Sequence, residues 1–298
     1  MQIFINTILV GLSSGAIYSL MSLALVLVWR STRVVNFAAA GQAILSTYIG
    51  YEAMSSMHNY WLSLPVAILA GAGISALVEA LVMRPLAKRS KGTPVEAIAP
   101  VIATLGVLGG IRSLAGLIWG NNFIQYTSPL SSKGYTIGQT TIPFSPQNAA
   151  IVIGAVVVMA MFAAIFKFTR LGLALRAASF QPEISRLAGV RVDRIRTIGW
   201  AFAGAAGAVA GALVTPTSYL SPNSLDLLLV SGFVAAVIGG LESLIGAVVG
   251  GVVLGLGFAF ILQYIGTSVT FSAAFIILVI VLLIRPQGIF GRRSGREA

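Results

Sequence analysis

The chain has 298 residues, of which 57% are hydrophobic and only 9% are charged, and its mean hydropathy is +0.94. A water-soluble domain is about one-quarter charged, so this composition excludes one and indicates a protein that spans a membrane. Cysteine is absent, which excludes disulfide frameworks, thiolate metal sites and cysteine nucleophiles. His58 is the only histidine available for metal binding or acid–base chemistry.

Nine apolar stretches follow one another along the chain. A membrane-spanning helix needs about 20 mainly apolar residues, so we predict an all-α transmembrane bundle of about eight to nine segments. The second and seventh stretches are short and rich in small residues, which is typical of broken or re-entrant helices that are enclosed by protein or line a cavity. The stretches are 3–29, 35–51, 62–83, 98–119, 149–166, 198–214, 225–241, 244–265 and 271–284.

The basic residues between these stretches predict the orientation of the chain, because cytoplasmic loops retain Lys and Arg. If the loop after the first segment is cytoplasmic, 17 of the 19 basic residues fall on that side; only Lys133 and Arg112 fall elsewhere. We therefore expect an extracytoplasmic N-terminus and a cytoplasmic C-terminus. This topology accounts for the net charge of +11 without nucleic acid. The 17 residues are Arg30, Arg33, Arg84, Lys88, Arg89, Lys91, Lys167, Arg170, Arg176, Arg186, Arg191, Arg194, Arg196, Arg285, Arg292, Arg293 and Arg296.

The longest of the basic loops contains signals for a short helix. We expect one membrane domain over residues 1–298, with a polar outer loop at about 120–147 and this basic inner loop at about 167–197. Pro182 and Glu183 suit the first turn of a helix, and Gly189 suits its end. A helix this short is marginal in water by itself, so it must lie against either a partner protein or the lipid headgroups. Its apolar face consists of Ile184, Leu187 and Ala188.

The same loop carries a recognisable family pattern. Glu183-Ile-Ser185 followed by Gly189 has the E-x-[AS]-x-x-x-G spacing of ABC importer permeases. The run from Gly172 to Arg194 resembles the branched-chain amino-acid permease family, the LivH type. Further matches follow in the family's order over nearly the whole chain. They are Gly15-Ala-Ile-Tyr18, Val35-Asn-Phe-Ala38, Thr104-Leu-Gly106, Val237-Ile-Gly-Gly240 with Gly246 and Gly250-Gly251, and Arg285-Pro-Gln-Gly-Ile-Phe-Gly291.

This resemblance implies a permease subunit of an ABC importer for branched-chain or related amino acids in the bacterial inner membrane. Such a subunit would pair with a homologous second permease, as a heterodimer, and with two ATPase subunits and an extracytoplasmic solute-binding protein. The basic loop would then be the coupling helix that contacts an ATPase. Its implied docking residues are Glu183, Ile184, Leu187, Ala188 and Gly189, with Arg176 and Arg186 as flanking contacts.

ATP hydrolysis is expected on the partner subunits. The chain has no Gly-Lys dipeptide, so it lacks the phosphate-binding loop G-x-x-x-x-G-K-[ST]. We therefore expect a non-catalytic subunit with no catalytic residues and no metal or cofactor of its own; ATP and Mg would bind to the ATPases. The alternatives are an ion-coupled secondary transporter, which usually places acids near the midplane of broken helices, and a membrane enzyme, which needs nucleophiles, bases or metal ligands that are scarce here.

Uncharged polar residues within the segments are candidates for the solute pathway. They can hydrogen-bond the ends of a zwitterion without burying a permanent charge, although they can equally well join helices to one another. The glycine pair at 239–240 also suits a helix break that faces a pathway. The pathway candidates are Asn36, Phe37, Gln42, Thr104, Gly106, Gly239 and Gly240.

Two further features stand out within the segments. Small residues spaced by four predict close helix packing in the sixth segment, and they are Gly199, Ala203, Gly207 and Gly211. Arg112 lies inside the fourth segment. A charge at the centre of a bilayer costs about 2.5 to 3.5 kcal/mol, so Arg112 is a functional candidate, whereas acids such as Glu79 lie near segment ends and are expected to reach the interface.

Overall fold

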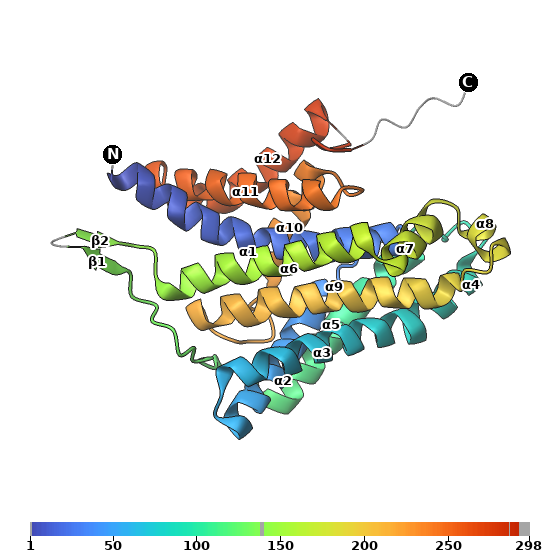
Figure 1. Cartoon of the computed structure of the whole chain (residues 1–298), viewed down its shortest axis with the longest axis horizontal. Helices are drawn as coiled ribbons and strands as arrows, with labels where there is room; N and C mark the ends of the chain where they lie inside the picture. Colours follow the sequence, from blue (N-terminus) through green and yellow to red (C-terminus); the bar gives the residue numbers. More distant parts are fainter. Residues whose placement is uncertain (1, 138–139, 286, 292–298) are drawn as a thin grey trace.

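The computed structural model describes residues 2–137, 140–285 and 287–291. Long helices lie side by side, with a small hairpin at one end and short helices at the other (Figure 1). We call these the hairpin end and the basic end.

Arg292, Arg293 and Arg296, which were assigned to the cytoplasmic set, lie outside the described residues, as does Pro286. The elements are α1 (Gln2–Thr32), α2 (Ala39–Met57), α3 (Tyr60–Val78), η1 (Glu79–Met83), α4 (Arg84–Ser90), α5 (Ala99–Trp119), β1 (Tyr135–Ile137), β2 (Thr140–Ile142), α6 (Pro146–Phe168), α7 (Arg170–Phe180), α8 (Pro182–Leu187), α9 (Val192–Val214), η2 (Thr215–Thr217), α10 (Asp226–Gly239), α11 (Leu244–Tyr264), η3 (Thr267–Val269) and α12 (Thr270–Ile284).

The prediction of an all-α transmembrane bundle is confirmed. In the described part of the chain, six helical stretches are long and apolar enough to cross a membrane. They are Gln2–Thr32, Tyr60–Ser90, Ala99–Trp119, Pro146–Phe168, Val192–Thr217 and Leu244–Tyr264. The remaining three predicted segments correspond to α2, which is a continuous helix of 19 residues but is less apolar, and to the shorter helices α10 and α12.

The seventh segment forms a short helix, in line with its composition. Helix α10 has 14 residues and is therefore about 21 Å long, which is less than the roughly 30 Å of a hydrocarbon core. The chain before it, residues 218–225, is not helical, and Leu220 and Leu225 within it are buried. Leu220 pairs through its backbone with Ile124, at 2.9 Å for each hydrogen bond. Protein thus covers part of this irregular backbone, and such cover is the condition for irregular backbone at membrane depth.

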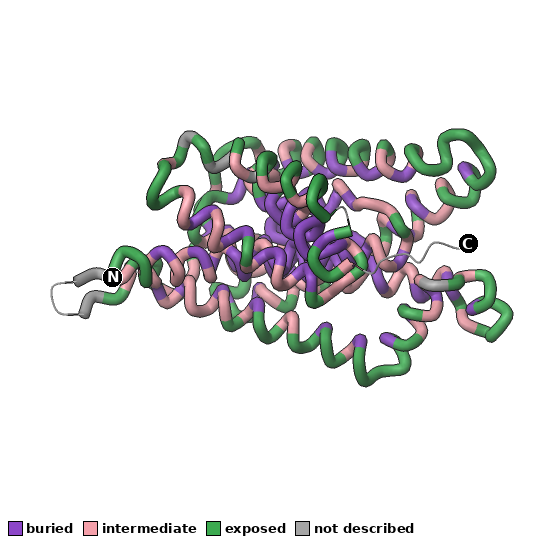
Figure 2. Tube along the Cα trace, turned by 90° about the horizontal axis from the view of Figure 1, so that it is seen from above, coloured by how far each residue is buried: buried purple, intermediate pink, exposed green. Residues whose placement is uncertain are grey.

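Helix α1 lies at the centre of the bundle. It packs most extensively against α11 and also against α9, α10 and α6. Figure 2 shows the buried residues gathered in the middle of the bundle and exposed residues along the outer helices. The outer faces carry large apolar side chains such as Leu69 on α3 and Leu117 on α5, which are 73% and 82% exposed. Side chains of this kind face lipid in a membrane protein, whereas they would aggregate in water.

The polar outer loop contains a feature that the sequence did not indicate. Strands β1 and β2 form an antiparallel hairpin in which Tyr135 pairs with Ile142. The loop is joined to the bundle by the buried Gln147, whose amide nitrogen donates to the Leu213 carbonyl at 3.1 Å. The Ser128 hydroxyl is 2.8 Å from the amide oxygen of Gln147. This residue therefore connects the loop to the hairpin end of α9.

The sequence predicted that the Glu79 side chain would reach the membrane interface, but the structure buries it inside the bundle. It is 2% exposed and begins the π-helical turn η1 between α3 and α4. Arg84 donates to both carboxylate oxygens, at 2.7 and 3.3 Å, and the Thr197 hydroxyl of α9 donates at 2.7 Å. A buried carboxylate is stable only when paired and hydrogen-bonded, and these partners satisfy that condition.

Candidate functional site

The basic end carries two short helices joined to α6. Helix α7 begins after Thr169, whose hydroxyl accepts a hydrogen bond from the Gly172 amide at 3.2 Å. Helix α8 starts at Pro182, as the sequence predicts. It ends at Leu187, after which Gly189 adopts φ +82°, a conformation that favours glycine.

Helix α8 presents apolar side chains to its surroundings. Leu187 is 89% exposed and Ile184 is 58% exposed, and Ala188 and Gly189 are exposed beside them. Ser185 is buried on the opposite side of the helix. The structure therefore brings the predicted docking residues of this segment together on one open surface.

Charged residues around α8 make mainly solvent-exposed contacts. Glu183 pairs with Lys91 at 3.8 Å, with both side chains more than 70% exposed. Arg186 pairs with Asp193 at 3.0 Å and so connects α8 to the first turn of α9. Exposed ion pairs are worth about 0 to 1 kcal/mol, so neither pair holds α8 rigidly in place.

Arg176, the other predicted flanking contact, lies apart from α8. It belongs to α7, and its guanidinium donates to the backbone carbonyls of Phe166 and Gly172. It lines a cavity between α1, α6, α7 and the start of α11 instead. The structure does not bring Arg176 to the exposed surface of α8.

Two of the predicted pathway residues pair with each other inside the protein. The Asn36 side-chain amide donates to the Gln42 side-chain oxygen at 3.1 Å, and the Asn36 oxygen accepts from the Ala38 amide at 3.1 Å. Both side chains are no more than 2% exposed. Their hydrogen bonds fix the start of α2, and a role in the solute pathway stays a prediction.

Two further pathway candidates, Thr104 and Gly106, lie on α5. The buried Thr104 hydroxyl donates to the Val101 carbonyl of its own helix at 2.8 Å. Gly106 faces open space, because a Cβ built there would meet nothing within 4 Å. Gly106 is therefore the one of these two that is accessible to a solute or to a partner helix.

The remaining pathway candidates contact α10 or belong to it. Phe37 lies against Phe233, with 6.1 Å between ring centroids. Gly239 packs against Gly246 of α11, where a Cβ would lie 1.9 Å from the Gly246 carbonyl oxygen. Gly240 ends α10 with φ +98°. The glycine pair therefore serves a tight turn within this chain, and its predicted place on the pathway is untested.

The predicted packing stripe of α9 lies against α1 and α2. A Cβ on Gly199 would meet Ser31 of α1, and one on Gly211 would meet Thr47 of α2 at 2.5 Å. Gly207 faces Ala43 of α2, and Ala203 is buried between them. These short separations are those expected when small residues allow helices to approach closely.

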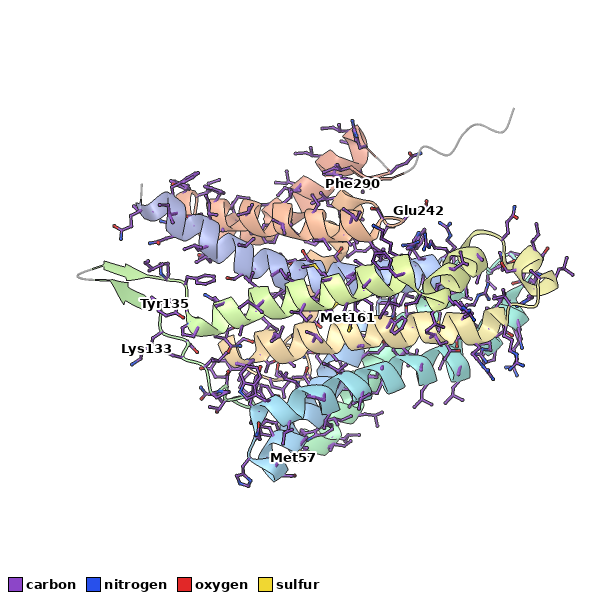
Figure 3. All side chains as sticks on the ribbon, in the orientation of Figure 1. Met57, Lys133, Tyr135, Met161, Glu242 and Phe290 are labelled. Atoms are coloured by element: carbon purple, nitrogen blue, oxygen red, sulfur yellow. The ribbon has the colours of Figure 1, made fainter. Side chains whose placement is uncertain are left out.

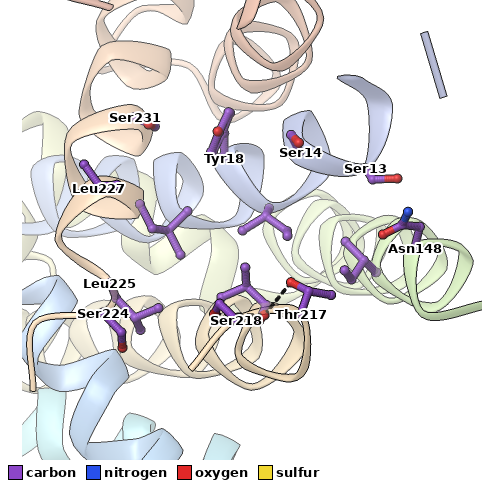
Figure 4. Close-up of a pocket in the computed structure, with 14 residues that line it drawn as sticks. Ser13, Ser14, Tyr18, Asn148, Thr217, Ser218, Ser224, Leu225, Leu227 and Ser231 are labelled. Atoms are coloured by element: carbon purple, nitrogen blue, oxygen red, sulfur yellow. Dashed lines mark hydrogen bonds between the residues drawn. The ribbon is translucent and has the colours of Figure 1, made fainter. Parts of the chain in front are cut away.

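A hydroxyl-lined cavity lies between α1, α6, α10 and the 214–225 segment (Figure 4). Its volume is about 280 Å³, and among the described residues none of those lining it is charged. Sequence reasoning missed it because its polar side chains come from segments far apart in the chain. Its polar lining consists of Ser13, Ser14, Tyr18, Asn148, Thr217, Ser218, Ser224 and Ser231.

Arg112 has a partner on another helix. Its guanidinium forms an ion pair with Asp226, the first residue of α10, and the two side chains are 29% and 38% exposed. The pair accounts for a charge inside a membrane segment, because an opposite charge at contact offsets part of the desolvation cost. Within the described residues, no group of three or more acids or histidines could hold a metal ion.

Comparison with known proteins identifies relatives over nearly the full chain. A probable branched-chain amino acid transport permease protein LivH from Methanocaldococcus jannaschii is 29% identical and covers 94% of this chain and 91% of its own. The LivH permease of the high-affinity branched-chain amino acid transport system of Salmonella typhimurium is 25% identical, covering 97% and 96%. The BraD permease of the corresponding system of Pseudomonas aeruginosa is 26% identical, covering 97% and 96%.

The family model for the permease component of branched-chain amino acid transport systems matches residues 7–284, which include most of α1 and all of the other apolar helices described above. The match includes the short helix α10 and the exposed helix α8 alike. The chain therefore belongs to the family of branched-chain amino acid transport system permease components.

Proposed function

We propose that this chain is the membrane-spanning permease subunit of an ATP-binding-cassette importer that moves branched-chain or related amino acids across the bacterial inner membrane. Family membership and the similarity to branched-chain amino acid permeases support the transported class. In this proposal the chain holds no nucleotide; ATP and Mg bind to separate ATPase subunits, and the basic end, with the C-terminus, is cytoplasmic. A homologous second permease, forming a heterodimer, and an extracytoplasmic solute-binding protein complete the importer.

The observation that carries the coupling role is the exposed apolar surface of α8. Leu187 and Ile184 project from a helix of only six residues at the basic end. So short a helix gains little stability in water by itself, and exposed leucine and isoleucine gain free energy when a partner covers them. The proposed partner is a groove on an ATPase subunit, with Glu183, Ala188 and Gly189 as the neighbouring contacts.

The proposed transport step is alternating access. Binding of ATP would close the two ATPase subunits, their movement would pull on α8, and the bundle would follow through α7 and α9. Helix α8 is suited to this role because short connections join it to both α7 and α9. The solute would pass between the two permease subunits, with Gly106 on an open face of α5.

The test substitutes a single exposed side chain. Leu187→Asp should abolish ATP-driven amino-acid uptake and release the ATPase subunits during purification, when the chain is co-expressed with ATPases from neighbouring reading frames. Leu187→Met is the matched control because it retains the apolar surface. Unchanged uptake in Leu187→Asp would contradict the coupling role of α8.

An ion-coupled secondary transporter is the alternative function. The Arg112–Asp226 pair within membrane segments is the observation in its favour, since such residues mark proton and ion pathways in carriers. Reconstitution of the chain alone in vesicles distinguishes the two functions. Accumulation of amino acid driven by a proton or sodium gradient, without any ATPase, would favour the carrier.

A further inference from the structure

A cavity toward the basic end is lined by several basic residues. It has a volume of about 570 Å³ and lies between α1, α6, α7 and the start of α11, and Phe290 also lines it. In Figure 3, Glu242 and Phe290 are labelled away from the hairpin end, where Lys133 and Tyr135 lie. Four cations line the cavity, and they are Arg30, Arg33, Lys167 and Arg176.

Only one acid among the described lining residues opposes these cations. Glu242 pairs with Arg33, so that ion pair is neutral. Arg30 lies over the Phe166 ring, 5.5 Å from its centroid, and Lys167 lies over Phe168 at 5.2 Å. Arg176 donates to backbone carbonyls. Three positive charges therefore remain without a carboxylate partner among the described residues, which favours an anion in the cavity.

The start of α11 adds to the positive potential. Ser243, which lines the cavity, caps α11 by accepting from the Gly246 amide at 2.9 Å, and Leu244 in the first turn also lines it. The N-terminus of a 21-residue helix carries a partial positive charge. Together with the unpaired cations, this end of α11 makes the cavity suited to a phosphate group.

The apolar side of the cavity indicates that the phosphate is part of a lipid. Ile245 and Phe290 line it and are 69% and 46% exposed, and Phe166 forms part of its wall. The cavity lies where α1 and α6 end, at Thr32 and Phe168, which is the level expected for lipid headgroups. A free inorganic ion would gain nothing from exposed isoleucine and phenylalanine, whereas an acyl chain would cover them.

We infer that this cavity binds the phosphate headgroup of an anionic phospholipid, with Arg30, Lys167 and Arg176 around the phosphate and an acyl chain over Ile245 and Phe290. Basic pockets between membrane helices on the cytoplasmic side are known to hold such headgroups. The inference does not depend on α8 docking to an ATPase. It assigns Arg176 to a lipid site in place of a flanking contact for that docking.

The experiment measures lipid binding by the full-length chain. Purified protein in neutral detergent is titrated with phosphatidylglycerol or phosphatidylcholine, and bound lipid is counted by native mass spectrometry. Each cation near an anionic lipid is worth about 1 kcal/mol, so Arg30→Gln or Lys167→Gln should weaken phosphatidylglycerol binding roughly fivefold. Glu242→Gln removes the acid and should strengthen it by a similar factor, and phosphatidylcholine binding should not change.

The matched control is Arg170→Gln, which removes the same charge from the same end of the molecule but does not line the cavity. Equal phosphatidylglycerol binding by wild type, Arg30→Gln, Lys167→Gln and Glu242→Gln would overturn the inference, as would equal weakening by Arg170→Gln. Displacement of the lipid by excess inorganic phosphate would identify a free anion as the ligand instead. Loss of ATPase copurification with unchanged lipid binding would assign the cavity to a protein partner.

Discussion

Arg112 of α5 and Asp226 of α10 form an ion pair between residues 114 positions apart in the chain. The pair lies at the first turn of the short helix α10, directly after the irregular segment that precedes it. The ion pair therefore connects the start of α10 to α5, a helix whose outer face is mostly exposed. Arg112, whose charge was unexplained by the sequence, acts in the structure as a link between these two helices.

The first prediction concerns the stability that this pair provides. Arg112→Met should destabilise the protein by about 1–3 kcal/mol, less than the roughly 3–5 kcal/mol of a fully buried pair, because both side chains are partly exposed. Arg112→Met combined with Asp226→Leu should recover part of that loss. Thermal unfolding in detergent measures both, as a double-mutant cycle. Additive effects of the two substitutions would show that the residues do not interact.

The Glu79 network predicts a second effect on stability. Thr197→Val removes a hydrogen bond to a buried carboxylate at nearly constant volume, and it should cost about 1.5–3 kcal/mol. Arg186→Gln is the control, because its ion pair with Asp193 is exposed and should contribute less than about 1 kcal/mol. The same thermal unfolding assay compares them. A loss in Arg186→Gln equal to that in Thr197→Val would contradict this ranking.

Close helix packing predicts opposite outcomes at two glycines. A Cβ on Gly204 would lie 2.1 Å from the Gly71 carbonyl oxygen of α3, so Gly204→Ala should force α9 and α3 apart and cost about 1–3 kcal/mol or more. At Gly109 of α5 a Cβ meets nothing within 4 Å, and Gly109→Ala should stabilise the helix by about 0.5–1 kcal/mol. Melting temperatures of the two purified variants test the difference in sign. Equal stability of both would mean that α3 and α9 are not in contact.

The sidedness of the chain can be tested by labelling, since the sequence has no cysteine. Ser132→Cys in the loop at the hairpin end should react with a membrane-impermeant maleimide in intact cells. Ala87→Cys on α4 should react only after the membrane is permeabilised, because the basic end is predicted to be cytoplasmic. Labelling in the reverse pattern would invert the proposed topology and remove the basis for an ATPase at α8.

The hydroxyl-lined cavity predicts an effect on transport without an effect on folding. Ser218→Leu fills part of a cavity of about 280 Å³ from an exposed position at its edge, and it should reduce amino-acid uptake several-fold if solute passes through the cavity. Ser132→Leu, in the outer loop away from the cavity, is the control. Uptake into vesicles containing the assembled importer gives the comparison. Wild-type uptake by Ser218→Leu would show that the solute does not pass through this cavity.

The sequence alone determined the features that depend on neighbouring residues. Apolar stretches of membrane length predicted the helical bundle, and the short seventh stretch corresponds to the short helix α10, whereas the second stretch forms the continuous 19-residue helix α2. Helix α8 was predicted from Pro182 to the stop at Gly189 because helix start and end signals lie within a few residues of each other. Composition likewise excluded a cysteine or thiolate site.

Only the tertiary structure decided which residues meet. Glu79 looked like a residue near a segment end, but Thr197 of α9 lies beside it and the bundle buries the Glu79 carboxylate. Asn36 and Gln42 were candidates for the solute pathway, and the structure shows that the Asn36 amide donates to the Gln42 side-chain oxygen inside the bundle. Both cavities likewise collect side chains from three or more segments, and no local pattern encodes such contacts. Side-chain pairing in a bundle depends on how the helices pack, and this is why the partner of Arg112 could not be named from its neighbours in the chain.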